Sequence, residues 1–124
     1  MDKKLVITND GSHSLFVPEI NECYHSRHGS IVEAEHVFIK NGLLAEKNKH
    51  LNILEIGFGT GLNALLTAQK AKQKNIYVNY HAIELYPVAK KEYSQLNFAE
   101  LIGIKKENLI QLHEAKWEET CEIN

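Results

Sequence analysis

The residues best suited to chemistry lie together between positions 53 and 63, in the run Ile-Leu-Glu-Ile-Gly-Phe-Gly-Thr-Gly-Leu-Asn. Glycines at 57, 59 and 61 let the backbone turn sharply and approach a ligand with no Cβ in the way. The residues that follow are typical of a helix, whose first N–H groups lack partners and favour an anionic group. The run predicts a ligand-binding loop, and a plain turn between a strand and a helix is the alternative.

The spacing of the glycines bears on which ligand fits. A dinucleotide fingerprint requires Gly-x-Gly-x-x-Gly or Ala, and the sixth position counted from Gly57 is Leu62. Leucine is too bulky there for the close contact between strand and helix that glycine permits. A nicotinamide-dependent oxidoreductase is therefore the least favoured interpretation.

A second carboxylate, Glu84, follows the next apolar run, which extends from Tyr77 to Ile83. At the tip of a neighbouring parallel strand, an acidic side chain accepts two hydrogen bonds from a ribose diol in nucleotide-binding α/β folds. Glu84 is predicted to bind ribose, and a solvated charge at the strand end is the alternative.

The pattern Glu-x-Gly-x-Gly-x-Gly, from Glu55 to Gly61, resembles motif I of the class I S-adenosylmethionine methyltransferases, whose loop holds the methionine end of the cofactor. The charges of the residues near the loop agree with those of this cofactor, which has no phosphate. Glu55 suits its ammonium and sulfonium groups, and the loop amides suit its carboxylate. The residues predicted to bind it are Glu55, Gly57, Phe58, Gly59, Thr60, Gly61, Asn63, Glu84 and Leu85.

The composition is that of a soluble globular domain. The 124 residues are 44% hydrophobic and 24% charged, and their net charge of −2 gives no field that attracts nucleic acid by itself. No apolar stretch nears the roughly 20 residues that span a bilayer, and the first apolar run is too short for a signal peptide. A cytoplasmic location is predicted. Cys23 and Cys121 form no Cys-x-x-Cys pair and are expected to be reduced thiols.

The elements that would position these residues begin with a hairpin. Strands are predicted over 5–8 and 15–17, joined through a turn that contains Asp10-Gly11. Ser30, with Glu33 three residues later, has the spacing of a capping box. The helix that it opens is expected to end near 41–42 and to place on one face Ile31, Ala34, Val37 and Phe38.

From residue 51 the predicted order is strand, helix, strand, helix. A strand over 51–56, a helix over about 60–74 and a strand over 76–84 form a right-handed βαβ unit of a parallel sheet. Pro87 is expected to open the next helix, and another helix is predicted over 107–118. The inward residues are predicted to be Leu62, Leu65, Leu66 and Ala68, then Leu109, Ile110, Leu112 and Trp117.

Together these elements predict an α/β fold, the Rossmann-like fold of class I S-adenosylmethionine methyltransferases. A doubly wound sheet normally has more than two parallel strands, so the fold is expected to be C-terminally truncated. Residues 1–50 would form an N-terminal β-hairpin and helix extension of the same domain, and residues 51–124 the first half of its cofactor-binding part. The incomplete sheet should leave an apolar surface on the last strand or helix, through which the chain self-associates.

A more specific resemblance covers roughly residues 5 to 90. Four segments carry it, in this order along the chain: Thr8-Asn9-Asp10-Gly11-Ser12, residues 21–29 with Tyr24-His25-Ser26, residues 35–39, and the glycine loop through Asn63. This order resembles the bacterial methyltransferases that complete 5-methylaminomethyl-2-thiouridine at the wobble position of tRNA, as stand-alone enzymes or as half of a bifunctional protein. The resemblance concerns the N-terminal portion of that family's domain only.

The resemblance implies methyl transfer from S-adenosylmethionine to the exocyclic amine of 5-aminomethyl-2-thiouridine in tRNA. Such an in-line displacement depends mainly on positioning. The acidic residue that orients the amine in the family would lie beyond residue 124, so the fragment alone is expected to be impaired. A flavin-dependent oxidoreductase that acts on the preceding step is the expected partner.

Tyr24 and His25 are the candidates for the acceptor side. Tyr24 is suited to bond or stack near the methionine end or the uridine, and His25, with an ordinary pKa of about 6.5, is suited to accept a proton. Structural roles in a loop are the alternative for both. Cys23, His25 and His28 lack a fourth ligand at the usual spacing, so no metal is predicted.

Two further functional interpretations stay open. A methyltransferase for a small molecule or a protein would share the glycine loop without the N-terminal segments. A non-catalytic fragment would bind the cofactor and show no turnover.

Overall fold

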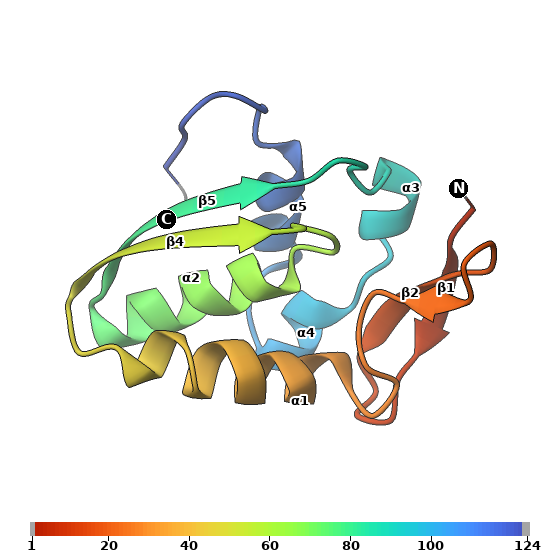
Figure 1. The fold of residues 1–124 in the computed structure, drawn as a ribbon, viewed down its shortest axis with the longest axis horizontal. Helices are drawn as coiled ribbons and strands as arrows, with labels where there is room; N and C mark the ends of the chain where they lie inside the picture. The colour runs from red at the N-terminus through yellow and green to blue at the C-terminus, as the bar shows by residue number, and fades with distance from the viewer. Residues whose placement is uncertain (1, 123–124) are drawn as a thin grey trace.

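Two parallel strands, β4 (His50–Ile56) and β5 (Tyr77–Ile83), form the sheet that carries the glycine loop, and helix α2 (Leu62–Lys74) connects them (Figure 1). The computed structural model describes residues 2–122. In the register of the sheet, His50 lies opposite Tyr77 and Ile56 lies opposite Ile83. The predicted order of strand, helix and parallel strand is confirmed.

Helix α2 covers one face of this sheet. Leu62, Leu65 and Leu66 are buried as their spacing predicts, and Ala68 is half-buried. On the opposite face Leu54, Ile56 and Ile83 are 63%, 73% and 56% exposed, because side chains alternate along a strand. The sheet therefore has an exposed apolar face, while self-association through it stays a prediction.

The N-terminal part contains the predicted hairpin, formed by β1 (Lys4–Ile7) and β2 (His13–Val17). In its turn, Asp10 Oδ1 accepts hydrogen bonds from the Ser12 amide at 2.9 Å and from the Thr8 hydroxyl at 3.0 Å. A third strand, β3 (Glu22–Cys23), pairs with β2 and is not predicted by the sequence. Two residues are too few for a periodic pattern.

A helical segment follows, made of α1 (Ser30–Ala34), the π-helix η1 (Glu35–Lys40) and the 3-10 turn η2 (Leu43–Ala45). The predicted capping box is wrong. Gly29 is the N-cap residue and has no side chain to cap the helix. Side chains of the hairpin turn accept from the first amides instead, Ser12 Oγ from Ile31 at 3.2 Å and Asp10 Oδ2 from Val32 at 3.0 Å. The Ser30 hydroxyl donates to the His13 carbonyl oxygen at 2.8 Å.

The inward face of this segment also differs from the prediction. Ala34 and Ile39 are buried, whereas Val37 and Phe38 are 48% and 49% exposed. A π-helix forms i→i+5 hydrogen bonds, so the residue five positions after Ala34 points inward, and not those three or four positions after it. The π-helix η1 ends near residue 41 as predicted, with Asn41 as its C-cap, and the short turn η2 follows it.

Three short helices complete the described chain, namely α3 (Lys90–Tyr93), α4 (Phe98–Ile102) and α5 (Lys106–Glu114). Pro87 does not open α3, because Val88 is buried in the core and Ala89, the N-cap, is extended. Helix α5 ends at Glu114, since Ala115 is extended, and Trp117 lies in a turn with half its surface exposed. Helix α4 has only five residues and is not predicted.

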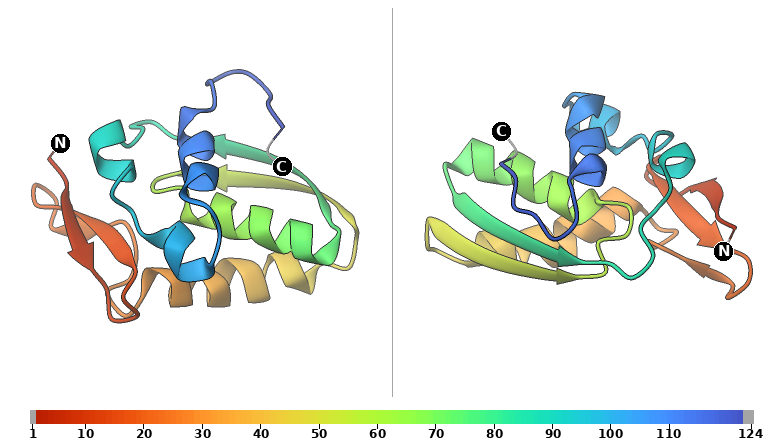
Figure 2. Two further views of the ribbon diagram at one scale, coloured as in Figure 1. Left: turned by 180° about the vertical axis from the view of Figure 1, so that it is seen from behind. Right: turned by 90° about the horizontal axis from the view of Figure 1, so that it is seen from above.

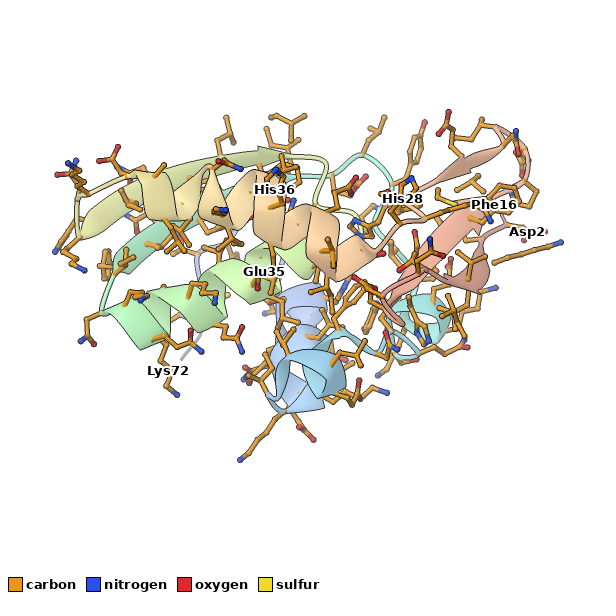
Figure 3. The ribbon with its side chains drawn as sticks, turned by 90° about the horizontal axis from the view of Figure 1, so that it is seen from below. Asp2, Phe16, His28, Glu35, His36 and Lys72 are labelled. Atoms are coloured by element: carbon orange, nitrogen blue, oxygen red, sulfur yellow. The ribbon has the colours of Figure 1, made fainter. Side chains whose placement is uncertain are left out.

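One core joins the N-terminal part to the rest of the chain. Asn97, which precedes α4, accepts a hydrogen bond from the His13 amide at 2.9 Å and donates one to the Gly11 carbonyl at 3.0 Å. Figure 2 shows α1 beside α2 and α4, with the hairpin at the end of α1. Figure 3 places Phe16 and His28 near the hairpin end and Lys72 at the other. The boundary at residue 50 stays a prediction. The core includes Leu15, Ala34, Ile39, Leu62, Leu65, Leu66, Leu96, Phe98 and Leu109.

Candidate cofactor site

The glycine loop lies at the carboxyl ends of the two parallel strands. The amides of Gly57 and Phe58 both donate to the Ile83 carbonyl oxygen, at 2.7 and 3.2 Å, so the loop is fastened to the end of β5. Gly59 has φ +56°, and a Cβ there would lie 3.2 Å from the Tyr24 ring. A larger residue would thus be strained and would displace Tyr24.

Glu84 is bound to the loop. Its Oε2 accepts a hydrogen bond from the Gly59 amide at 2.7 Å, and its Oε1 accepts one from the Tyr86 amide at 3.0 Å. The carboxylate is therefore an ordered part of the site. Each oxygen can accept a further bond, which leaves the predicted ribose role open as a proposal.

Glu55 and Asn63 form the most distinctive polar pair of the site. The Asn63 amide donates to Glu55 Oε2 at 2.8 Å. Glu55 Oε1 and Asn63 Oδ1 are buried and have no hydrogen-bond partner among residues 2–122. Burial raises the pKa of Glu55, and the bond from Asn63 and the nearby Tyr80 hydroxyl oppose this increase. Two buried acceptors without donors indicate a ligand that brings donors, preferably with positive charge.

A cleft of about 660 Å³ opens beside the loop and extends along β4 towards η1 and η2. This volume is within the usual range for small-molecule sites. Gly61, Glu84 and Leu85 do not line the cleft. Gly61 is buried, Glu84 reaches the loop through Gly59, and Leu85 is exposed after β5. The predicted residues that line it are Tyr24, His25, Glu55, Gly57, Phe58, Gly59, Thr60 and Asn63.

Tyr24 and His25 lie where this cleft meets a second one of about 490 Å³, since both clefts share Tyr24, His25 and Glu33. Burial, with the charges of Glu84 and Glu92, raises the pKa of Tyr24, so its phenol is neutral. His25 Nε2 lies 2.6 Å from the Thr60 hydroxyl, and Nδ1 lies 4.0 Å from Glu33 Oε1. Burial lowers the pKa of His25, and Glu33 opposes this.

His113 is the residue of the site that sequence reasoning misses. It lies in the last turn of α5, and its Nε2 donates to the Thr60 carbonyl oxygen at 2.8 Å. Burial lowers its pKa. A single histidine on a short helix carries no local signal, because its partner lies far away in the sequence.

The described residues supply little else that bears on ligands. Within residues 2–122, no group of three histidine, cysteine or acidic side chains gathers as a metal site. Cys23 and Cys121 are free thiols, as predicted. No helix in the described part of the chain is long and apolar enough to cross a membrane.

The site fits S-adenosylmethionine on two grounds. The partnerless oxygens of Glu55 and Asn63 match the donors and positive charge of its methionine end. A Cβ built on Gly57 would have no neighbour within 4 Å, so there is space for a ligand against the backbone. A phosphate would instead be repelled by Glu55 and Glu84.

The chain is similar in sequence to part of two MnmC proteins. Over 101 residues it is 36% identical to the "tRNA 5-methylaminomethyl-2-thiouridine biosynthesis bifunctional protein MnmC" of Leptospira interrogans. Over 94 residues it is 34% identical to the protein of the same name from Burkholderia mallei. These matches cover 73% and 71% of this chain but 16% and 14% of the relatives, so the chain spans about a sixth of their length.

A solved structure supports the same relationship. The fold is similar to the crystal structure of MNMC2 from Aquifex aeolicus, with a TM-score of 0.56 and 25% identity, over 74% of this chain and 34% of the other. No protein-family model matches the chain. The family resemblance and the α/β methyltransferase-like fold predicted from the sequence are confirmed by these similarities.

Proposed function

Since the chain is homologous to part of the MnmC proteins, we propose that it binds S-adenosylmethionine and takes part in methyl transfer to the 5-aminomethyl group of the wobble 2-thiouridine of tRNA. The names of the relatives support tRNA modification, and the glycine loop supports the cofactor. The bound cofactor would supply a methyl group on a sulfonium. The residues of this chain would bind the cofactor, orient it and shield it from water.

The pair formed by Glu55 and Asn63 is the observation that carries this proposal. Both lie at the loop, both are buried, and each keeps one oxygen without a donor. An ammonium has three donors and a positive charge, so it would satisfy both oxygens and favour the ionised form of Glu55. Phe58, Gly59 and Thr60 would line the rest of the methionine end.

The other end of the cofactor would lie across the end of β5. Glu84 is fixed by two backbone amides and keeps a free lone pair on each oxygen for a ribose diol. Leu85 is 77% exposed directly after it, and an adenine ring would cover this apolar side chain.

On the acceptor side we assign Tyr24 and His25. Their position at the junction of the two clefts supports this role. His25 is neutral at pH 7, because burial lowers its pKa, and its Nδ1 edge faces Glu33 and the second cleft. The carboxylate that orients the amine in the family would come from sequence that the relatives contain and this alignment does not span. The tRNA and a flavin-dependent oxidoreductase for the preceding step are the proposed partners.

A methyl-transfer assay tests the function. The chain, and a form extended to the length of the Aquifex protein, are incubated with labelled S-adenosylmethionine and tRNA that carries 5-aminomethyl-2-thiouridine. We expect label transfer by the extended form and at least about 10²-fold less by the 124-residue chain. Transfer to tRNA with an unmodified wobble uridine would contradict the proposed acceptor. Cofactor binding with no turnover by either form would favour a binding fragment.

A further inference from the structure

Thr60 is held from two sides by histidines that lie far from it in the sequence. Nε2 of His25 lies 2.6 Å from the Thr60 hydroxyl, and Nε2 of His113 lies 2.8 Å from the Thr60 carbonyl oxygen. Thr60 is 1% exposed, so bulk water does not replace either bond. One histidine follows β3 and the other belongs to α5. The middle of the glycine loop is thus fixed by two separate elements.

We propose that His113 and His25 are positioning residues that hold the glycine loop, through Thr60, in the conformation that binds the cofactor. This inference rests on the proposed function for its purpose, but the two contacts belong to the chain itself. Fixing Thr60 also fixes the peptide groups that join it to Gly59 and Gly61, because each peptide unit is planar. The loop amides then keep their direction before the ligand arrives, which lowers the cost of ordering on binding.

The proton positions on the two rings follow from their partners. A carbonyl oxygen only accepts hydrogen bonds, so Nε2 of His113 must carry a proton. His25 has a carboxylate near Nδ1, which favours a proton on that nitrogen, so Nε2 of His25 accepts from the Thr60 hydroxyl. The two neutral rings are therefore expected to be opposite tautomers.

The packing around His113 is built for this contact. Its ring stacks on Tyr93 of α3, with centroids 4.3 Å apart and planes 9° apart, and meets Phe58 edge-on at 5.1 Å. A Cβ on Gly61 would lie 3.1 Å from His113 Nε2 and 3.0 Å from the Phe58 ring. Only glycine at 61 therefore lets α5 reach the loop.

Two substitutions of the same residue separate the hydrogen bond from the packing. His113→Phe keeps a ring on Tyr93 and removes the donor, whereas His113→Gln brings an amide N–H to the place of Nε2. We expect the affinity for S-adenosylhomocysteine, measured by calorimetry, to fall about tenfold in His113→Phe, because a buried carbonyl loses its donor. His113→Gln should recover to within about threefold of the original chain. The control is Glu114→Gln, which breaks only the exposed ion pair with Lys90 and should leave the affinity unchanged.

Nitrogen-15 spectra of the histidine rings decide the inference without any cofactor. We expect a protonated Nε2 on His113 and a protonated Nδ1 on His25. The opposite tautomer of His113, or equal affinity of His113→Phe and the original chain, would overturn the positioning role. If the original chain does not bind S-adenosylhomocysteine at all, the proposed function is contradicted, and the ring spectra still decide whether the two histidines hold Thr60. If His113→Phe does not fold, His113→Gln and the spectra decide the question.

Discussion

At the scale of residues, the site depends on polar groups whose partners are missing until a ligand binds. Glu55 is held in a buried position by Asn63, and its other oxygen is buried without a donor. Such an arrangement costs stability in the free chain, because a buried acceptor has lost its water. A cationic ligand that supplies the missing donor removes this cost, which favours binding.

Glu55→Gln tests this balance. The substitution keeps the shape and removes the negative charge, so affinity for S-adenosylhomocysteine should fall by about 1.5–3 kcal/mol, while thermal stability should stay equal or rise. Calorimetry and thermal unfolding measure the two effects. Glu107→Gln, on the first turn of α5 and exposed, is the control. A parallel loss of stability and affinity would instead assign Glu55 to the fold alone.

The two buried histidines predict a pH dependence of stability. Burial lowers the pKa of both His25 and His113, so below about pH 6.5 the unfolded chain binds more protons than the folded chain. Their contribution to stability is therefore complete above about pH 6.5 and is lost as the pH falls through the lowered values. Urea unfolding at pH 7.5 and 5.5 should show a smaller decrease in His113→Gln than in the original chain. Equal decreases would remove His113 from this effect.

At the scale of elements, the sequence predicts the parts whose cause is local. The strand, glycine loop, helix and second strand between 50 and 83 are found where periodicity places them. The parts that differ have distant causes. Ser30 donates to His13 and not to its own helix, and Asn97 bonds to the hairpin more than 80 residues before it. The π-helix that exposes Phe38 depends on packing, which propensity does not describe.

The site follows the same rule. The glycines, Glu55 and Glu84 are recognisable because a short motif carries their chemistry. His113 is not, because its role exists only where α5 meets the loop. A substitution at Gly61, which contacts His113, tests directly whether α5 packs against the loop.

Gly61→Ala should destabilise the fold by about 2–4 kcal/mol, from backbone strain at φ +80° together with overlap with Phe58 and His113. Gly103 is the matched control, with φ +77° and no atom within 4 Å of an added Cβ. Gly103→Ala should therefore cost only the strain, about 1–2 kcal/mol. Chemical denaturation measures both. Equal losses would show that α5 does not press on the loop.

At the scale of the whole molecule, the sheet is covered on one face only. Leu54, Ile56 and Ile83 form an open apolar face on β4 and β5, and both strands have a free edge, since the sheet has two strands in the described chain. Exposed apolar faces and free edges favour association. This property concerns the 124-residue chain and is separate from its chemistry.

The expected result is concentration-dependent association, measured by light scattering. Leu54→Lys places a charge in the middle of the open face and should reduce it. Val32→Lys is the control, because Val32 is exposed on α1, away from the sheet. A monomer at all concentrations, or equal effects of both substitutions, would contradict association through the sheet.

Calorimetric titration with S-adenosylhomocysteine decides whether the glycine loop holds S-adenosylmethionine or its product. We predict saturable binding with one ligand per chain, no binding of NADH, and loss of binding in Gly59→Val, whose side chain would enter the space of Tyr24. Gly103→Val, strained in the same way far along the chain, should bind as the original does. Unchanged affinity in Gly59→Val, or binding of NADH in preference, would contradict the account.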